Sequence, residues 1–447
     1  MPFTAWTLFT DLGLIAILLL LGQLVRARLA LVQRLFLPAN VLAGLTGLVL
    51  GPHALDLLPF SDAIGTYPGV LIALIFASLP FSSGAVSVAA RRRPVAELCA
   101  YSILIIFLQW GAGLLFGLVL LGALWPALHP GFGAILASGF VGGHGTAAAI
   151  GSAFAERGWP EAGSLAMTAA TVGIGGAIVG GMAWVNWGAK RGVTRYIARF
   201  EELPQELRSG LIPADRRSVL GRETISSIAL DPLVFHFALI CAAAVIGYFI
   251  GQWSADLMGR YHLPTFCLAF LAAVALKVGL NSFAALHYVD TRTNMRLSGS
   301  LTDLLVAFGI ASINVPVLVK YAYPLSALFL FGFLICWCVF RFVGPRLFGE
   351  LWFEKSLYTW GWTIGIMAMG IALLRIVDPD GESRILDDFA LAYLVVGLVE
   401  VIMVSLAPIL IAQGYYWPLA LVTTGAAFLL LLFLLIVKRE TPDLQNQ

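Results

Sequence analysis

Apolar runs of about 20 residues recur along the whole chain, and they restrict its fold more than any other feature. A helix of about 20 apolar residues crosses the roughly 30 Å hydrocarbon core of a bilayer. Hydrophobic residues make up 60% of the chain and charged residues 12%, against about 45–50% and about 25% in soluble domains. Because an isolated segment in hydrocarbon must satisfy its own backbone hydrogen bonds, the sequence predicts an all-α polytopic membrane protein.

Eleven uninterrupted spans are predicted to cross the membrane. They are residues 6–25, 37–55, 67–88, 97–121, 163–187, 232–255, 263–280, 300–319, 324–343, 386–412 and 416–437. Two further apolar stretches, 131–155 and 356–377, are interrupted by glycine and polar residues. If both are re-entrant hairpins, most lysines and arginines fall on one side of the membrane, as the positive-inside rule requires. This topology places the N-terminus outside and the C-terminus in the cytoplasm.

The two halves of the chain contain similar segments in the same order. LPANVLAGLTGLVLG starts at Leu37 and LPTFCLAFLAAVALKVG at Leu263, while SLAMTAATVG from Ser164 and ALAYLVVGLVE from Ala390 keep the same offset. Each half has an odd number of crossings, so the second half is inverted relative to the first. Inverted repeats with a broken helix at equivalent places are typical of secondary transporters.

The expected organisation follows from these segments. We expect a first repeat at 1–187, a cytoplasmic linker at 188–230, a second repeat at 231–412, and an extra transmembrane helix with a cytoplasmic tail at 413–447.

The first interrupted stretch, SGFVGGHGTAAAI, is a candidate substrate site. Glycine at Gly142, Gly143 and Gly145 permits left-handed turns and close approach of a ligand to the backbone. A hairpin tip here exposes amides at the start of a helix, which favour an anion, and Thr146 lies in the first turn of that helix. His144 can donate to a carboxylate or carry protons. Alternatively, the glycines serve tight helix packing and His144 holds the hairpin in place.

The second interrupted stretch repeats this pattern with different side chains. Gly361 and Thr363 again break an apolar run, and Arg375 follows. Arginine is a natural bidentate partner for a substrate carboxylate, but Arg375 can equally pair with Asp378 or Asp380. All three residues are candidates for substrate binding.

Five residues are candidates for binding a coupling cation. Glu400 lies in the middle of a span, where an ionisable residue is a functional hypothesis by default. Thr168 and Thr171 carry hydroxyls in the span of the first half that corresponds to it, with packing as the alternative. Ser312 and Asn314 lie near the end of the span 300–319. The expected ion is Na⁺ or H⁺, and no other cofactor is expected.

Several segments resemble the bacterial sodium:glutamate symporter family. They are LPANVLAG at Leu37, SGFVGGHGTAAA at Ser138, AMTAATVGIGGAIVGG at Ala166 and LPTFCLAF at Leu263, and the resemblance extends to about Ala412. It implies two inverted five-helix repeats with hairpins that meet near mid-membrane, Na⁺-coupled uptake of glutamate, a homodimer, and elevator-like motion in the bacterial inner membrane. The extra helix at the C-terminus departs from the family, as do Trp360, Trp362 and the Met-Ala-Met run that starts at Met367.

These features predict a cation-coupled symporter of a small organic anion or amino acid such as glutamate. The alternative is a proton-coupled transporter or exchanger with the same fold, in which His144 and Glu400 titrate. An enzyme is not expected, because the chain lacks H-E-x-x-H, G-x-S-x-G and paired intramembrane aspartates. A net charge of +2 does not suggest a nucleic-acid partner, so the expected partners are a small molecule, the bilayer and a second copy of the chain.

Overall fold

The computed structural model describes residues 3–35, 37–52, 54–82, 92–194, 209–214, 217, 219, 221–258, 265–378 and 382–437. Over these residues the chain is largely helical and contains no strand, which confirms the all-α prediction. The helices are α1 (Ala5–Arg28), α2 (Ala30–Arg34), α3 (Ala39–Leu50), α4 (Tyr67–Ser82), α5 (Arg92–Phe107), α6 (Gly113–Phe116), α7 (Gly122–Leu124), α8 (Ile135–Phe140), α9 (Gly143–Ala155), α10 (Glu161–Arg191), α12 (Pro232–Met258), α13 (Thr265–Ser282), α14 (Thr291–Ala311), α15 (Val315–Lys320), α16 (Ala322–Cys338), α17 (Gly344–Leu347), α18 (Trp352–Ile364), α19 (Met367–Val377), α20 (Ile385–Ala412) and α21 (Tyr416–Val437).

Among the described residues, nine helical stretches are long and apolar enough to cross a membrane. They are Ala5–Arg28, Asp62–Ser82, Arg92–Leu124, Glu161–Arg191, Pro232–Ser254, Thr265–Ser282, Ala322–Leu347, Ile385–Ala412 and Tyr416–Leu434. This finding supports a polytopic membrane protein. The eleven crossings stay a prediction, because α3, in the predicted span 37–55, has 12 residues and α14, in the predicted span 300–319, is not among the nine. The inverted repeats also stay a prediction.

The predicted span 300–319 has the wrong bounds. Instead of one helix, α14 ends at Ala311 and a short helix, α15, starts at Val315. The break occurs because the Asn314 side chain accepts a hydrogen bond from the Val317 amide at 3.3 Å, and Pro316 stands in the first turn of α15. Asparagine at the cap and proline at the helix start are the usual signals for a new helix.

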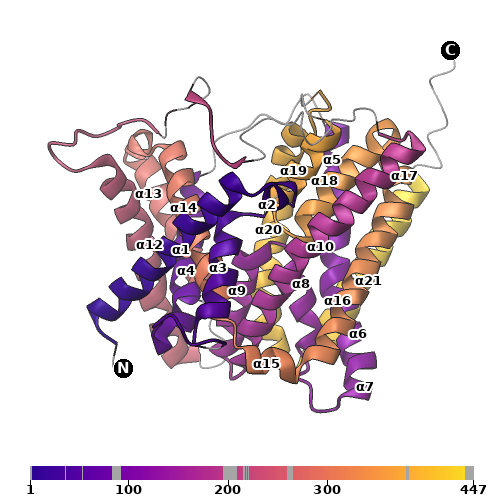
Figure 1. Cartoon of the computed structure of the whole chain (residues 1–447), viewed down its shortest axis with the longest axis horizontal. Helices are drawn as coiled ribbons and strands as arrows, with labels where there is room; N and C mark the ends of the chain where they lie inside the picture. The colour runs from indigo at the N-terminus through magenta and orange to yellow at the C-terminus, as the bar shows by residue number, and fades with distance from the viewer. Residues whose placement is uncertain are drawn as a thin grey trace.

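The helices pack in two groups (Figure 1). In the first bundle α1, α3, α4, α12, α13 and α14 contact one another. The second bundle contains α5 to α10 and α15 to α21. The bundles meet where α9 and α10 contact α4 and α14. Each bundle therefore takes helices from both halves of the chain.

Both interrupted stretches form two helices separated by a break. Between α8 and α9, Val141 is extended with ψ of 128° and Gly142 is left-handed with φ of +74°. Between α18 and α19, Ile366 is extended with φ of −141°. The two helices of each pair also pack against each other. We call residues 141–143 the first tip and residues 365–366 the second tip.

A buried carboxylate fixes α1 against the start of α4 within the first bundle. Asp11 is 1% exposed. It accepts hydrogen bonds from the Ser61 amide at 2.9 Å, from the Ser61 hydroxyl, and from the Tyr67 hydroxyl at 2.7 Å. A buried carboxylate is stable only with such partners.

We expect Asp11→Ala to destabilise the protein far more than Tyr67→Phe. The first change leaves buried donors on Ser61 and Tyr67 unpaired, at about 1–3 kcal/mol each, whereas the second removes one hydrogen bond worth about 1 kcal/mol. Thermal unfolding in detergent measures both. Equal loss from the two variants would contradict the assigned role of Asp11.

Candidate functional site

The two tips touch each other in the second bundle, close to its contact with the first. Gly143 has φ of +61°. A Cβ on this residue would lie 2.6 Å from Ile366 Cγ2 and 3.0 Å from the Gly365 carbonyl oxygen. Separations this short leave no room for a side chain, so the first tip approaches the second through bare backbone.

Glu400 lies beside the first tip and is held by two hydroxyl groups. The Thr146 hydroxyl donates to Glu400 Oε1 at 3.1 Å, and the Tyr393 hydroxyl donates to Oε2 at 3.1 Å. The Glu400 side chain is 8% exposed. A Cβ on Gly142 would overlap both Glu400 and Thr146, so glycine allows the carboxylate to reach the start of α9.

The first turn of α9 offers unsatisfied backbone donors. The first amides of a helix have no partner within it. For α9 the preceding residue is Gly142, and within the described chain no side chain caps this turn. The helix dipole adds positive potential at this end. The turn is therefore suited to an anionic group, as predicted from the glycines.

His144 connects the first tip to α10. Its Nε2 lies 3.1 Å from Thr171 Oγ1. That hydroxyl donates its proton to the Met167 carbonyl at 2.9 Å, so it accepts from His144, whose Nε2 carries the ring proton. Nδ1 is then an acceptor, and it is buried without a hydrogen-bond partner among the described residues.

Two adjoining cavities surround the tips. The larger, which we call the tip chamber, has a volume of about 700 Å³ and is lined by Gly142, His144, Gly145, Thr146 and Glu400 together with residues of α4, α13, α14 and α20. The smaller, the small tip cavity, has a volume of about 100 Å³ and is lined by Gly142, Trp362, Ile366, Met367, Tyr393 and Glu400. The structure thus brings together Glu400 and the predicted substrate residues of the first stretch, except Gly143, which is not among the lining residues of either cavity.

The predicted residues of the second stretch do not line these cavities. Gly361 packs against the backbone of Gly370, so it serves the contact between α18 and α19. The Thr363 hydroxyl donates to the Thr359 carbonyl at 2.7 Å. Ile366 and Met367 of the same stretch line both cavities instead.

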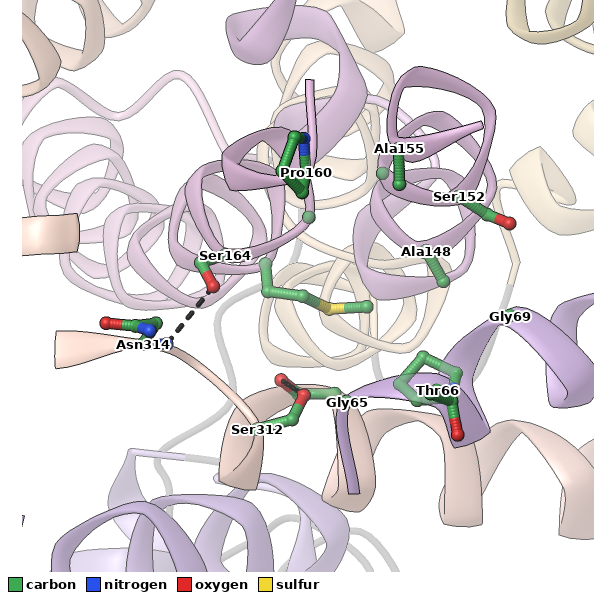
Figure 2. Close-up of a pocket in the computed structure, with 15 residues that line it drawn as sticks. Gly65, Thr66, Gly69, Ala148, Ser152, Ala155, Pro160, Ser164, Ser312 and Asn314 are labelled. Atoms are coloured by element: carbon green, nitrogen blue, oxygen red, sulfur yellow. Dashed lines mark hydrogen bonds between the residues drawn. The ribbon is translucent and has the colours of Figure 1, made fainter. Parts of the chain in front are cut away.

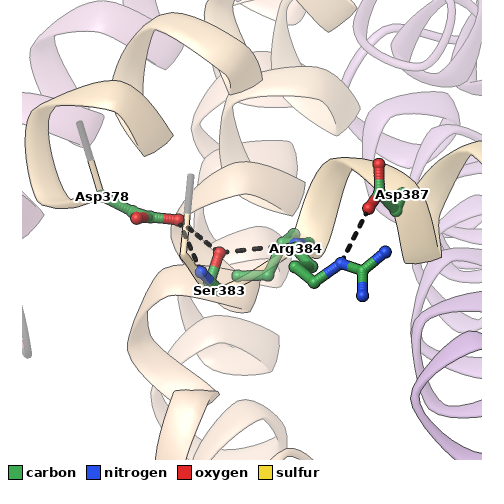
Figure 3. Close-up of polar contacts among 5 residues, drawn as sticks. Asp378, Ser383, Arg384 and Asp387 are labelled. Atoms are coloured by element: carbon green, nitrogen blue, oxygen red, sulfur yellow. Dashed lines mark hydrogen bonds and ion pairs between the residues drawn. The ribbon is translucent and has the colours of Figure 1, made fainter. Parts of the chain in front are cut away.

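Arg375 lies in the last turn of α19, about 12 Å along the helix from Met367 at 1.5 Å per residue. Its proposed partner Asp378 is 1% exposed and accepts from the Glu382 amide at 3.0 Å and from the Ser383 hydroxyl at 2.5 Å. Figure 3 shows Asp378 directed at Ser383 and Arg384 directed at Asp387. Asp380 lies outside the described residues.

The predicted cation ligands are not gathered at one place. Ser312 and Asn314 line a separate cavity of about 460 Å³, the distal cavity, with Ser164 and Met167 of α10. Figure 2 shows the Ser164 hydroxyl directed toward the backbone of Asn314, whose backbone N–H donates to that hydroxyl at 3.1 Å. Thr168 donates to the Ser164 carbonyl at 2.7 Å and lines none of these cavities. The structure does not bring these residues to Glu400.

Sequence reasoning missed two polar residues near the tips, Tyr393 and Gln109, and noted a third, Trp362, only as a departure from the family pattern. Tyr393 precedes Glu400 by seven residues on α20, a spacing that places both on one helix face and that could have identified it. Gln109 lies in a π-helical turn, Leu108–Ala112, and its Nε2 donates to the Thr363 carbonyl at 2.9 Å. Gln109 is placed by tertiary contacts with no local signal.

We expect Gly143→Ala to reduce transport about a hundredfold while the protein still folds. The methyl group would strain a left-handed residue and push the tips apart, and displacement of a site by about 1 Å can reduce a rate by that factor. Gly175→Ala is the matched control, because a Cβ there meets nothing within 4 Å. Initial uptake rates in liposomes measure both, and normal uptake by Gly143→Ala would contradict the role of the tip contact.

Comparison with known proteins identifies the family of the chain. The family model of the sodium/glutamate symporters matches residues 6–352. The match ends at the first residue of α18, so the extent to about Ala412 expected from the sequence is not confirmed. Comparisons with curated proteins and with solved structures find no match. Since the family match covers more than half of the chain, the protein belongs to the sodium/glutamate symporter family of membrane transporters.

Proposed function

We propose that the protein is a cation-coupled secondary symporter, driven by Na⁺, of a small organic anion or amino acid such as glutamate. The observation that carries this proposal is the contact between the Glu400 carboxylate and the start of α9 at the meeting point of the two tips. Positive helix potential and a carboxylate in one chamber provide partners for both an anionic group and a cation.

Glu400 is the proposed coupling residue. It lies fifteen residues into α20, about 22 Å along a helix that begins at Ile385. A buried carboxylate at this depth needs a cation, a proton or hydrogen bonds, and the hydroxyls of Thr146 and Tyr393 supply the last of these. A cation that enters the small tip cavity would meet the same carboxylate.

The arrangement of cavities supports alternating access by an elevator motion. The tip chamber is lined by Ile72 of α4 and Thr146 of α9. The distal cavity is lined by Gly69 of α4 and Ala148 of α9. On each helix, the residues that line the two cavities are less than one helical turn, about 5 Å, apart. Both cavities lie where the first bundle meets the second, so movement of one bundle along the other would open the tips to either side.

The remaining parts of the proposal come from the family and the charge pattern. We place the protein in the inner membrane of a bacterial cell, with the N-terminus outside and the C-terminus in the cytoplasm. The proposed assembly is a homodimer. The predicted C-terminal tail lies outside the described residues.

Uptake in liposomes tests the coupling ion. We expect an inward Na⁺ gradient to drive accumulation of substrate, because the carboxylate at the tip binds the cation together with the solute. Radiolabelled glutamate and a panel of neutral amino acids are the solutes. Equal uptake with a pH gradient and no Na⁺ would favour the proton-coupled alternative, in which Glu400 and His144 carry protons.

We expect Glu400→Gln to lower uptake at least about tenfold and to flatten its dependence on cation concentration. Gln keeps an acceptor for one hydroxyl but removes the charge, and a hydrogen-bonded charged partner is worth about 1.5–3 kcal/mol. Glu161→Gln is the control, because Glu161 binds Lys320 at 2.8 Å and lines neither tip cavity. An unchanged cation profile in Glu400→Gln would show that Glu400 has a structural role only.

A further inference from the structure

We propose that the tip chamber binds a neutral, zwitterionic α-amino acid with an apolar side chain. This inference rests on the proposed transport function and narrows the substrate class of the same site. Three independent observations lead to it: unpartnered polar atoms at the tips, the charged side chains that line the chamber, and the composition of the chamber wall.

Two of the buried polar atoms that lack a hydrogen-bond partner within the described chain belong to residues that line the tip cavities. His144 Nδ1 is an acceptor and Trp362 Nε1 is a donor. Their side chains are 1% and 4% exposed, and they line the tip chamber and the small tip cavity respectively. Buried polar atoms are rarely left unpaired in a protein, and these two, each beside a cavity at the tips, fit a ligand that supplies both an acceptor and a donor.

An α-amino acid supplies both an acceptor and a donor on one carbon atom, as the carboxylate and the ammonium group that we together call its head group. Its carboxylate matches the Trp362 indole N–H and the uncapped amides of α9. Its ammonium matches the Glu400 carboxylate and the His144 acceptor. Both halves of the head group would therefore be neutralised at the tips, where residues from two distant parts of the chain meet.

The charged side chains of the chamber include one basic group, and that group is already hydrogen-bonded. Among its described lining residues, Glu400 is the one carboxylate and Lys277 the one lysine or arginine. Lys277 Nζ donates to the Pro80 carbonyl near the end of α4, where a cation also stabilises the helix end. Lys277 lies five residues before the end of α13 at Ser282, whereas Glu400 lies deep in α20. The lysine that a second carboxylate would need is therefore already held at the end of α4, and the proposed coupling cation belongs to Glu400.

The chamber wall is apolar on four helices. Ile72 and Phe76 of α4, Phe270 of α13, Val306 of α14 and Leu398 of α20 all line it. Burying a carboxylate against such a wall without a partner carries a large desolvation penalty, whereas an aliphatic or aromatic side chain gains from the contact.

Competition experiments test the substrate class. In liposomes with an inward Na⁺ gradient, we expect leucine to inhibit uptake of a labelled amino acid at a concentration at least about tenfold lower than alanine, since each methylene in an apolar pocket contributes about 10-fold or more. We expect glutamate to be weaker than leucine by a similar factor. Glutamate that competes better than leucine would overturn the inference and leave the proposed symport function intact.

Two tryptophan variants separate head-group binding from stability. Trp362→Phe keeps the ring and removes the donor, so it should weaken leucine and alanine binding equally, by about tenfold, as expected for loss of a hydrogen bond to a charged group. Trp360→Phe is the control, because that indole donates to the Ala177 carbonyl at 3.3 Å and lines neither cavity. Amino-acid-dependent thermal stabilisation measures binding without transport.

A third variant tests the wall itself. Phe270→Ala should reduce the preference for leucine over alanine by severalfold and leave the head-group contacts in place. An unchanged ratio in this folded variant would overturn the assignment of the chamber to the substrate side chain. If Na⁺ gradients drive no uptake of leucine, alanine or glutamate, and none of these stabilises the protein, the proposed function itself fails together with the inference.

Discussion

The contact between the two tips is the constraint on which the rest of the site depends. Gly143 meets Gly365 and Ile366 at separations that exclude any side chain, and this contact joins the first interrupted stretch to the second. Unwound backbone at membrane depth is stable only when it is buried in protein or lines a wet cavity. Here each tip covers part of the other, and the exposed part faces the two tip cavities.

Packing around the tips leaves little freedom for the elements that hold them. Gly173 of α10 approaches the Ile364 carbonyl just before the second tip, and Gln109 Nε2 donates to the Thr363 carbonyl at 2.9 Å. The Trp360 indole of α18 donates a hydrogen bond to the Ala177 carbonyl of α10 at 3.3 Å. These interactions fix the second tip from several helices at once, so the small tip cavity keeps its shape within a largely apolar core.

Two hydrogen bonds explain how a buried acidic side chain is tolerated beside the tips. Glu400 accepts one hydrogen bond from α9 and one from its own helix, so the carboxylate is shared between elements that belong to the tip region. Its binding partners come from residues 146 and 393, which are far apart in the sequence. A cation or an ammonium group would bind the Glu400 carboxylate, which Thr146 and Tyr393 already hold in place.

The sequence by itself determined the class of the protein and the first half of its site. Apolar runs of spanning length predicted the all-helical membrane fold, because only helices satisfy their own backbone in hydrocarbon. The glycines of the first stretch predicted a broken helix, since left-handed residues such as Gly142 strongly favour glycine. Glu400 stood out as a charge within an apolar span, and it does lie at the tip.

Only the tertiary structure decided which further residues share that place. Ser312 and Asn314 have the right chemistry for a cation but line the distal cavity. Gly361 and Thr363 serve contacts within the pair α18 and α19. Conversely, Trp362 and Ile366 reach the tips. Side-chain direction at a helix break depends on how two hairpins dock, and that docking is set by contacts between segments about 220 residues apart in the chain, for which no local pattern exists.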